Sequence, residues 1–573
     1  ANLALTFLFL PERHPHPSSS TMRLFLAAAL LALAFAEPRV VMQARTFVSP
    51  EWEMVGASPQ DAVIPLTFAV TERLSVEEIE AELLAVSDPS SPRYGQHYTL
   101  EGLKELLAVP ENTAAVHQFL QRFPVVDTRT SPNGDYVSVK VTVATAEAML
   151  AAKFFAYTHK TQGVTLHRCA DYSLPAALST AVDFVGHTVS LTSLSRAPVI
   201  TSTGLRGTAA TGATPALLSR YYGITQNDVK NAGATQAVFE TIGQSFEPSD
   251  VTAFDKEFDV PAQTIAKVIG PNDPSSCASN PNNCVEAELD VEVITSIAQD
   301  GATTFWSIPG DESFLQWIEA VASDSNPPLV HSISYGAPES EEDPTTATNF
   351  NKEVAKMGVR GLTVLVAAGD DGVAGSQARS SKAYCGFHPS WPATAPSVTA
   401  VGATQGPESN DPEIVCQSNK GGLITSGGGF STLFDTPTWQ SSQVSNYLST
   451  GPSLPPKSMF ASTGRGYPDI TGMGHNYNIV VNGQTFQGSG TSASTPLLAG
   501  MITLINSARL TAGKSSVGFI NPAIYGFDAS VYNDITSGEN QCAAGSSNPV
   551  CCDYGFTASA GWDPASGLGS PKF

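Results

Sequence analysis

Short apolar segments alternate with helix-like segments from about residue 216 onward, and this alternation constrains the fold of the chain more than any other feature. Six apolar runs rich in β-branched residues are predicted strands, at residues 236–242, 264–269, 303–308, 329–335, 362–368 and 397–401. Three helices are predicted among them, at residues 285–298, 313–322 and 351–359. Near-continuous apolar strands that alternate with helices are typical of an α/β fold in which helices cover both faces of a parallel sheet. In such a sheet, sites form beyond the carboxyl ends of the strands.

Residues 37–192 show a different pattern, in which strand-like and helical runs are mixed. The predicted strands span 63–70 and 136–143, and the predicted helices span 76–85, 100–107 and 144–152. This pattern predicts a separate α+β domain ahead of the α/β domain of residues 216–573.

The segment between the two domains, residues 193–215, has no periodic pattern of large apolar residues. It is rich in Thr, Ser, Gly, Ala and Pro and contains Arg196 and Arg206. Such a composition is typical of an exposed linker, and exposed linkers are where proteases cut. We therefore expect residues 193–215 to be a cleavable linker.

The N-terminus has the features of a secretory signal peptide. Residues 1–21 resemble a translated non-coding leader, and Met22 is the expected start. Arg23 precedes an almost wholly apolar run, and Ala34-Phe35-Ala36 fits a small-x-small cleavage site, so residues 22–36 are predicted to be the signal peptide. No later apolar run reaches the length of about 18–20 residues that a membrane span needs.

The charge balance limits the classes of partner. Acidic residues outnumber basic ones 53 to 30, for a net charge of -23. This excess argues against nucleic acids and anionic membrane surfaces as partners. It suits a protein that works in acid, because an acidic surface loses charge as its carboxylates become protonated.

The chain has eight cysteines, of which Cys169 lies apart from the others. The other seven fall in three loop-like neighbourhoods: Cys277 with Cys284, Cys385 with Cys416, and Cys542 with Cys551 and Cys552. On the secretory route these can form disulfides, but their connectivity does not follow from the sequence. No Asn-x-Ser/Thr sequence occurs, so N-glycosylation is not expected.

The strongest single candidate for chemistry is Ser492. It lies in the run Gly490-Thr491-Ser492 that leads, through Pro496, into an apolar helix. The small residues permit a tight turn, and the first turn of a helix favours developing negative charge. This setting suits a serine nucleophile and its oxyanion.

A serine nucleophile needs a base, and no histidine after the linker has a suitable context. His331, His388 and His475 are all expected to be structural or exposed.

Carboxylates are the alternative base. In the predicted helix 285–298, Glu286 and Asp290 share one face with Val293 and Ile297, a buried stripe. Neighbouring buried carboxylates cannot both ionise cheaply, so the pair should titrate together and accept the serine proton in mild acid. Glu288 and Glu292 fall on the other face and are predicted to be ordinary surface charges.

A third acidic residue, Asp370, directly follows the predicted strand 362–368. It is therefore expected at the carboxyl end of the sheet, where a protonated acid can donate a hydrogen bond to an oxyanion.

Taken together, these motifs resemble the sedolisin family of serine-carboxyl peptidases, which includes the tripeptidyl peptidases. Ser492 matches the family's nucleophile, Glu286 and Asp290 its Glu–Asp pair, and Asp370 its oxyanion-hole acid. Three further fragments resemble family signatures: residues 91–98 in the activation domain, and residues 426–431 and 465–470 in the catalytic domain. The resemblance implies a ferredoxin-like activation domain ahead of a subtilisin-like catalytic domain.

The family also binds one structural Ca²⁺ near its C-terminus. The matching positions are Asp534, Ile535, Ser559, Gly561 and Asp563. Two carboxylates with backbone carbonyls suit a hard cation that prefers oxygen ligands. Ser559 stands where the family usually has glycine.

The sequence thus predicts an acid-acting serine peptidase that is made as an inactive precursor with its own propeptide as inhibitor. A His-dependent neutral peptidase of the same fold and a catalytically dead, calcium-stabilised binding module are the alternatives. Tripeptidyl-peptidase and endopeptidase activity remain open. We expect a monomer that is secreted or delivered to an acidic, lysosome-like compartment.

Overall fold

The computed structural model describes residues 37–160, 163–192, 194–196, 199–201, 212–308, 310, 312–546 and 548–573. The predicted leader (1–21), the predicted signal peptide (22–36) and most of the predicted linker lie outside these ranges. No helix within the described ranges is long and apolar enough to cross a membrane.

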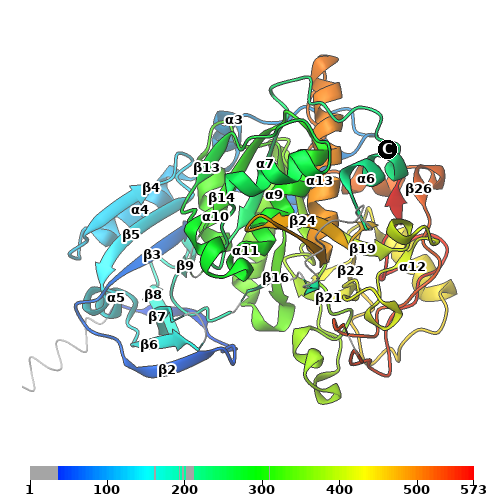
Figure 1. Cartoon of the computed structure of the whole chain (residues 1–573). Helices are drawn as coiled ribbons and strands as arrows, with labels where there is room; N and C mark the ends of the chain where they lie inside the picture. Colours follow the sequence, from blue (N-terminus) through cyan, green and yellow to red (C-terminus); the bar gives the residue numbers. More distant parts are fainter. Residues whose placement is uncertain are drawn as a thin grey trace, which may run out of the picture.

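An eight-stranded sheet forms the centre of the larger part of the molecule (Figure 1). Its strands, in spatial order, are β13 (Lys267–Ile269), β14 (Ala302–Ser307), β12 (Thr235–Glu240), β15 (Val330–Ile333), β17 (Thr363–Ala367), β19 (Thr399–Gln405) and β20 (Ile414–Val415), with β23 (Ile470–Met473) also paired to β19. All these pairings are parallel except that of β20. The six predicted strands are therefore confirmed as neighbours in one largely parallel sheet.

Helices cover both faces of this sheet, as predicted. On one face, α9 (Val285–Ile297) and α13 (Thr491–Thr511) pack against sheet residues such as Val238 and Leu365. On the other face, α10 (Ser313–Ser323) and α11 (Pro344–Val359) pack against alternate residues of the same strands. The period of two along each strand thus places apolar side chains in two separate cores.

Helix α11 begins at Pro344 rather than at residue 351, where the sequence predicted it. The Asp343 side chain accepts hydrogen bonds from the Thr345 and Thr346 N–H groups, and Pro344 occupies the first helical position. The Asp343 cap and Pro344 both favour a helix start at this point. The sequence prediction missed it because the first turns of α11 are polar and show no helical spacing of apolar residues.

The N-terminal part has its own antiparallel sheet, with strand order β4 (Asp127–Thr130), β5 (Tyr136–Thr142), β3 (Val63–Val70) and β9 (Val182–Gly186). Helices α2 (Val76–Ser87), α3 (Leu100–Leu107) and α4 (Pro110–Leu120) connect β3 to β4, and α5 (Val143–Leu150) follows β5. This βαββαβ order is the expected ferredoxin-like topology, and it has a separate apolar core.

The N-terminal part docks on α11 through buried ion pairs. The Lys356 ammonium lies 2.8 Å from Asp135 and 2.9 Å from Glu72, and Lys352 lies 2.9 Å from Asp183. Each pair joins a lysine of the larger part to a carboxylate of the N-terminal part. In Figure 1 the two parts lie side by side, with the blue and cyan elements packed beside the sheet.

Three disulfides are present among the described residues: Cys277–Cys284, Cys385–Cys552 and Cys542–Cys551. Cys169 and Cys416 are buried thiols. Cys385 pairs across 167 residues rather than with Cys416, its neighbour in sequence.

Candidate active site

Ser492 lies in the first turn of α13, directly after β25 (Gln484–Ser489) and Gly490. Its side chain is fully buried. A Cβ at position 490 would come 3.2 Å from Asp370 Oδ2 and 3.4 Å from the Ser492 nitrogen, so these groups lie close together around the glycine. The predicted turn before an apolar helix is therefore confirmed.

Asp370 follows β17 at the carboxyl end of the sheet and contacts the same turn. The Thr491 N–H and hydroxyl both donate to Asp370 Oδ1, each at 2.8 Å. Oδ2 is buried and has no hydrogen-bond partner among the described residues. Burial raises the pKa of Asp370 to about 7, although the two bonds from Thr491 act to lower it. The carboxyl group thus holds a proton in acid, with one oxygen left to face an incoming group.

Glu286 and Asp290 lie in the first turns of α9, and both are fully buried. The Ser334 hydroxyl donates to Asp290 Oδ1 at 2.9 Å. Burial raises the pKa of Asp290 well above its usual range, and the nearby charges of Glu240 and Glu286 raise it further. The predicted pair of coupled buried carboxyls is therefore present.

Glu240 is a third carboxyl group in this cluster, and sequence reasoning missed it. It is the last residue of β12, is fully buried, and accepts a hydrogen bond from the Tyr335 hydroxyl at 2.6 Å. Burial raises its pKa to about 8. The available signal was an acid at the carboxyl end of a predicted parallel strand, where sites form.

Helices α9 and α13 run in the same direction. Their C-terminal halves both contact the segment 227–230, since Asn227 Nδ2 donates to the Ile297 carbonyl and the Lys230 N–H donates to Ser507 Oγ. The helices touch at Gly500, where a Cβ would come 2.9 Å from Ile297 Cβ and 3.3 Å from the Ile294 carbonyl oxygen.

This contact places the two first turns at the same end of the helix pair. Counted from the closer contact, between Gly500 and Ile297, Ser492 lies eight residues earlier in its helix and Glu286 lies eleven residues earlier in its own. Because each residue rises about 1.5 Å, the two first turns lie within about one helical turn of each other along the helix axes.

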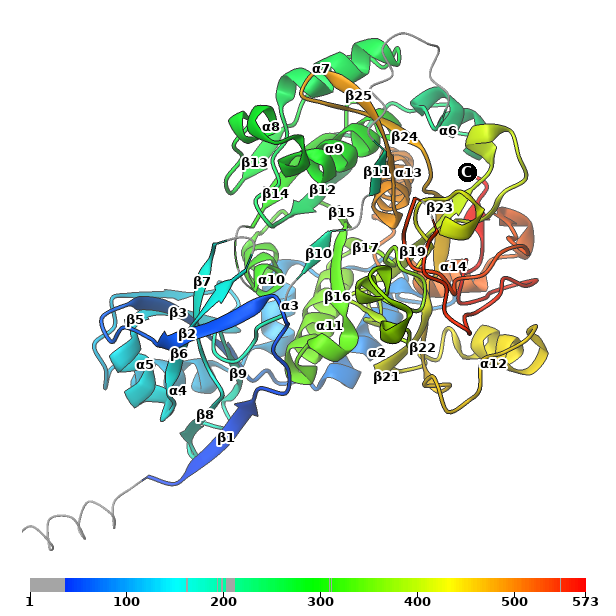
Figure 2. The same cartoon turned by 60° about the horizontal axis from the view of Figure 1, so that its bottom comes forward.

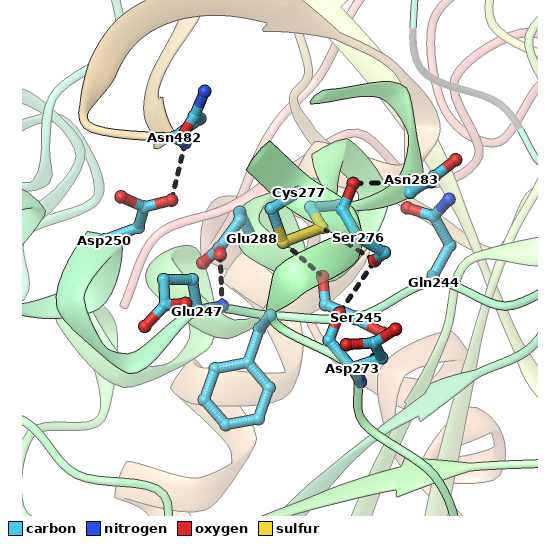
Figure 3. Close-up of a disulfide and its surroundings, with 12 residues drawn as sticks. Gln244, Ser245, Glu247, Asp250, Asp273, Ser276, Cys277, Asn283, Glu288 and Asn482 are labelled. Carbon is cyan, nitrogen blue, oxygen red and sulfur yellow. Dashed lines mark hydrogen bonds between the residues drawn. A yellow bond between two sulfur atoms is a disulfide. The ribbon is translucent and has the colours of Figure 1, made fainter. Parts of the chain in front are cut away.

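The prediction that Glu288 and Glu292 are surface charges is wrong, because α9 is buried on every side. The Glu247 N–H donates to Glu288 Oε1 at 2.5 Å, and the Val480 N–H donates to Glu292 Oε2 at 2.9 Å. Figure 3 shows Glu288 against Glu247, with Asp250 bound to Asn482 of the neighbouring hairpin. The hairpin of β24 (Tyr477–Val481) and β25, together with α7 (Pro248–Glu257), covers the face that was expected to meet solvent.

The histidines differ in position, but none lies within the carboxyl cluster. His331 is buried within β15, and burial lowers its pKa to about 4. His475 contacts Ser489 Oγ, and burial lowers its pKa to about 4 as well. His388 lines the cleft beside Asp370, and burial lowers its pKa too.

The cleft beside Asp370 runs between β16 (Tyr335–Pro338) and the segment 367–372. Two short strands of the predicted linker pair with strands near Asp370 and Ser492. β10 (Ser195–Arg196) pairs antiparallel with β16, and β11 (Val199–Thr201) pairs antiparallel with β25, which leads to Ser492. Figure 2 shows β10 beside β16 and β11 beside β25. Backbone of the precursor thus occupies the edge of a strand that lines the cleft and the edge of the strand that leads to Ser492.

The five predicted calcium ligands are brought together near the C-terminus. The Gly561 N–H donates to Asp534 Oδ2, and the Ser559 N–H donates to Asp563 Oδ2, both at 3.0 Å. The Ser566 hydroxyl bridges from Asp563 to the Ile535 carbonyl. Within the described ranges, no group of three or more His, Cys, Asp or Glu side chains could hold a metal. Two carboxylates with backbone carbonyls nevertheless fit the oxygen preference of calcium.

Two family models match the chain: "Pro-kumamolisin, activation domain" over residues 50–191 and "Subtilase family" over residues 309–517. Tripeptidyl-peptidase 1 of Bos taurus is 35% identical over 551 residues, covering 91% of this chain and 92% of the relative. Tripeptidyl-peptidase 1 of Homo sapiens is 34% identical over 545 residues, covering 92% and 93%. The solved structure of Pseudomonas sedolisin, a serine-carboxyl proteinase, is 23% identical with a TM-score of 0.48, covering 64% of this chain and 96% of the sedolisin.

The chain belongs to the tripeptidyl-peptidase 1 family of sedolisins.

As a sedolisin, the chain is a serine-carboxyl peptidase made with an activation domain, and its catalytic part has the subtilisin-like fold. The activation domain identifies the chain's own propeptide as its inhibitor. These relatives do not favour a non-catalytic binding module.

Proposed function

We propose that this sedolisin cuts peptide bonds in acid with Ser492 as nucleophile and Glu286 as general base. The observation that carries the proposal is that Glu286 and Ser492 lie in buried first turns at the same end of two packed, parallel helices. The Ser492 hydroxyl attacks the scissile carbonyl carbon, and its proton passes to Glu286. Glu286 then protonates the leaving amine, and water hydrolyses the acyl-enzyme by the same proton route.

Asp290 orients Glu286 and shares its charge. Its raised pKa and its bond from Ser334 support this role, because Asp290 then keeps its proton in acid and can donate it to an ionised Glu286. Asp370 donates a hydrogen bond to the oxyanion of the tetrahedral intermediate through its otherwise unpartnered oxygen.

Labelling by a serine-directed reagent at acid pH tests this assignment. We expect label on Ser492 at pH about 4 and none on the Ser492→Ala chain. Labelling that is strongest near pH 8, or that persists in the Ser492→Ala chain, would contradict it.

The substrate is proposed to be the unblocked N-terminus of a peptide, from which tripeptides are released. The support is the name of the relatives that match over nine tenths of the chain. Mass spectrometry of products from matched unblocked and N-blocked peptides at pH about 4 tests this proposal. Equal cutting of both peptides at internal bonds would instead assign an endopeptidase.

Maturation is proposed to remove residues 37–192 by a cut within residues 193–214. The linker composition supports this proposal, as do the strand pairings of β10 and β11, which must be released before a substrate can bind. Terminal sequencing of acid-treated protein should give a new N-terminus in that range. A mature chain that still starts near Glu37 would refute it.

One structural Ca²⁺ is proposed to bind the carboxylates of Asp534 and Asp563 and the carbonyls of Ile535, Ser559 and Gly561. Asp563 supports the site, because burial raises its pKa to about 7 and a bound cation would stabilise its charged form.

The signal-like sequence and the three disulfides support a secretory route, ending outside the cell or in an acidic compartment. We propose that the enzyme acts there as a monomer.

A further inference from the structure

His97 lies in the fragment 91–98 of the activation domain, and its ring enters a slot on the catalytic part. The slot is lined by Gly361 and Gly518, both at positive φ. A Cβ at position 361 would come 2.4 Å from His97 Nδ1, and a Cβ at position 518 would come 2.8 Å from His97 Nε2. Any larger residue at either position would therefore exclude the ring.

Neighbouring contacts hold the fragment in place. The Tyr98 N–H donates to the Val359 carbonyl at 3.0 Å, at the C-terminal end of α11. The Arg509 guanidinium lies over the Tyr94 ring, 5.6 Å from its centroid. These contacts tie His97 to the docked state of the activation domain.

The slot accommodates a neutral ring. The Ser516 hydroxyl donates to the Gly361 carbonyl at 2.8 Å, so its oxygen is free to accept from His97 Nδ1, which lies 3.5 Å away. His97 Nε2 is enclosed and has no hydrogen-bond partner among the described residues. A second proton on the ring would therefore be buried without an acceptor.

The charges around the slot act in the same direction. The charged side chains on the elements packed here include Arg509, Lys514, Arg360, Arg93 and Glu82, with Glu101 of α3 and Glu353 and Lys356 of α11. Arg93 and Glu82 pair with each other, and Arg360 bonds the Val321 and Asp324 carbonyls. Arg509 is the charge that acts on the ring, and it repels a protonated imidazole.

We propose that His97 is an acid-sensitive latch: its neutral ring holds the activation domain on the catalytic part, and its protonation weakens that contact. The proposal rests on the activation domain being the inhibitor that must leave before the peptidase works. It assigns the signal for release to one side chain outside the catalytic site.

The size of the effect follows from linkage. Burial, and then Arg509, lowers the pKa of His97 from 6.5 to about 4 in the docked state. The contact is at full strength above the free value of 6.5 and weakens as pH falls toward 4. Because each pKa unit is a tenfold change, docking weakens by roughly 300-fold across this window.

Hydrogen exchange of the full-length Ser492→Ala chain tests the latch without any cutting. We expect the amide of Tyr98, after correction for the intrinsic rate, to lose protection as pH falls from 6.5 to 4. His97→Gln should retain this protection at pH 4, and His97→Arg should lack it even at pH 7. Where His97→Gln does not fold, His97→Phe supplies a planar ring that cannot be protonated.

A matched control is His117→Gln, because His117 bonds Thr130 of its own domain. This variant should behave like the parent chain. The same loss of protection in the parent and in His97→Gln would overturn the latch.

Processing of the chain that retains Ser492 separates the latch from the proposed peptidase. The pH of half-maximal self-cutting should fall in His97→Gln and rise in His97→Arg. If no cutting occurs while the exchange results hold, the peptidase assignment fails and the latch stands. If cutting occurs with the same pH dependence in all three chains, the latch fails.

Discussion

Glu292 accepts a hydrogen bond from the Val480 N–H at 2.9 Å, on the face of α9 that lies away from Asp290 and the sheet. Glu288 lies one turn earlier on the same face and contacts the Glu247 N–H. Both carboxyls are fully buried, and Asp250 and Asp255 lie near enough to act on Glu292. The face of α9 that lies away from Asp290 therefore carries a second group of buried acidic residues.

Glu288→Gln and Glu292→Gln should stabilise the protein at neutral pH. Burial raises the pKa of both groups well above 4.5, so their contribution to stability is full below pH 4.5 and is lost as pH rises. A glutamine keeps an oxygen for the backbone bond and cannot ionise. We expect a melting temperature higher by about 2–4 °C at pH 7 and nearly unchanged at pH 4.

Glu257→Gln is the control for this experiment. Glu257 is exposed and accepts a bond from Thr485 on the same hairpin. Its melting temperature should follow the parent at both pH values. Equal increases in melting temperature from Glu257→Gln and Glu292→Gln would show that burial of the carboxyl group is not the cause of the stabilisation.

Ser492→Ala and Glu286→Gln should each lower kcat by at least about 10³-fold while the fold persists. Because the two groups act in one proton transfer, the double variant should lose little more than either single variant. Glu288→Gln should change kcat at pH 4 by less than about tenfold, since its face of α9 is turned away from Asp290. Steady-state kinetics at pH 4 check all four chains, and equal losses from Glu286→Gln and Glu288→Gln would contradict a carboxylate base at 286.

Asp370→Asn should alter the pH profile more than the rate in acid. Asp370 can donate to the oxyanion while it is protonated, which holds below about pH 7, so the rate should fall as pH rises through that value. An asparagine oxygen can still accept from Thr491, and its NH₂ group donates at every pH. In Asp370→Asn, kcat/KM should therefore no longer show the decrease with rising pH that the ionisation of Asp370 causes in the parent enzyme.

Asp370→Ala is the comparison variant, because alanine cannot donate a hydrogen bond to the oxyanion. It should cost about 10²–10³-fold in kcat in acid. A falling limb that is the same in the parent and in Asp370→Asn would exclude Asp370 as the titrating donor.

Removal of calcium should lower the melting temperature, and Asp534→Ala should abolish the dependence on added calcium. Asp534 is the better variant, because Asp563 also accepts bonds from the Ala565 and Ser566 N–H groups and its loss disturbs the loop directly. Thermal melts at acid pH, with chelator and with added calcium, give the readout. A melting point that chelation leaves unchanged would show that the site is misassigned.

The sequence predicted the sheet and its flanking helices because apolar runs report burial directly. The prediction that Glu288 and Glu292 are exposed was wrong because helical periodicity assumes that one face of a helix meets solvent. In the structure, tertiary contacts from β24 and α7 cover that second face of α9. No pattern within the α9 sequence indicates that other elements cover this face. The predicted start of α11 was wrong for a related reason: its capped first turns are polar, so they show no helical spacing of apolar residues.

The candidate site was predictable where a residue sits in a motif. Ser492, Asp370, Glu286 and Asp290 lie in short runs with a defined chemistry, and the structure places them at helix starts or at the carboxyl end of a strand. Glu240 sits at the end of a strand without a motif, and its link to Asp290 depends on how strands are ordered in the sheet. The Cys385–Cys552 bridge also depends on that long-range arrangement.

The pairing of β10 with β16 and of β11 with β25 has a consequence for the choice of substrate. Both contacts are made by main-chain groups, which every peptide carries in the same geometry. If the linker is cut as proposed, the edges of β16 and β25 become free to pair with an extended peptide, and such pairing depends on strand direction and backbone extension rather than on side-chain identity. An enzyme that holds its substrates by such pairing would accept peptides of many sequences, and in the precursor its own linker covers both strand edges.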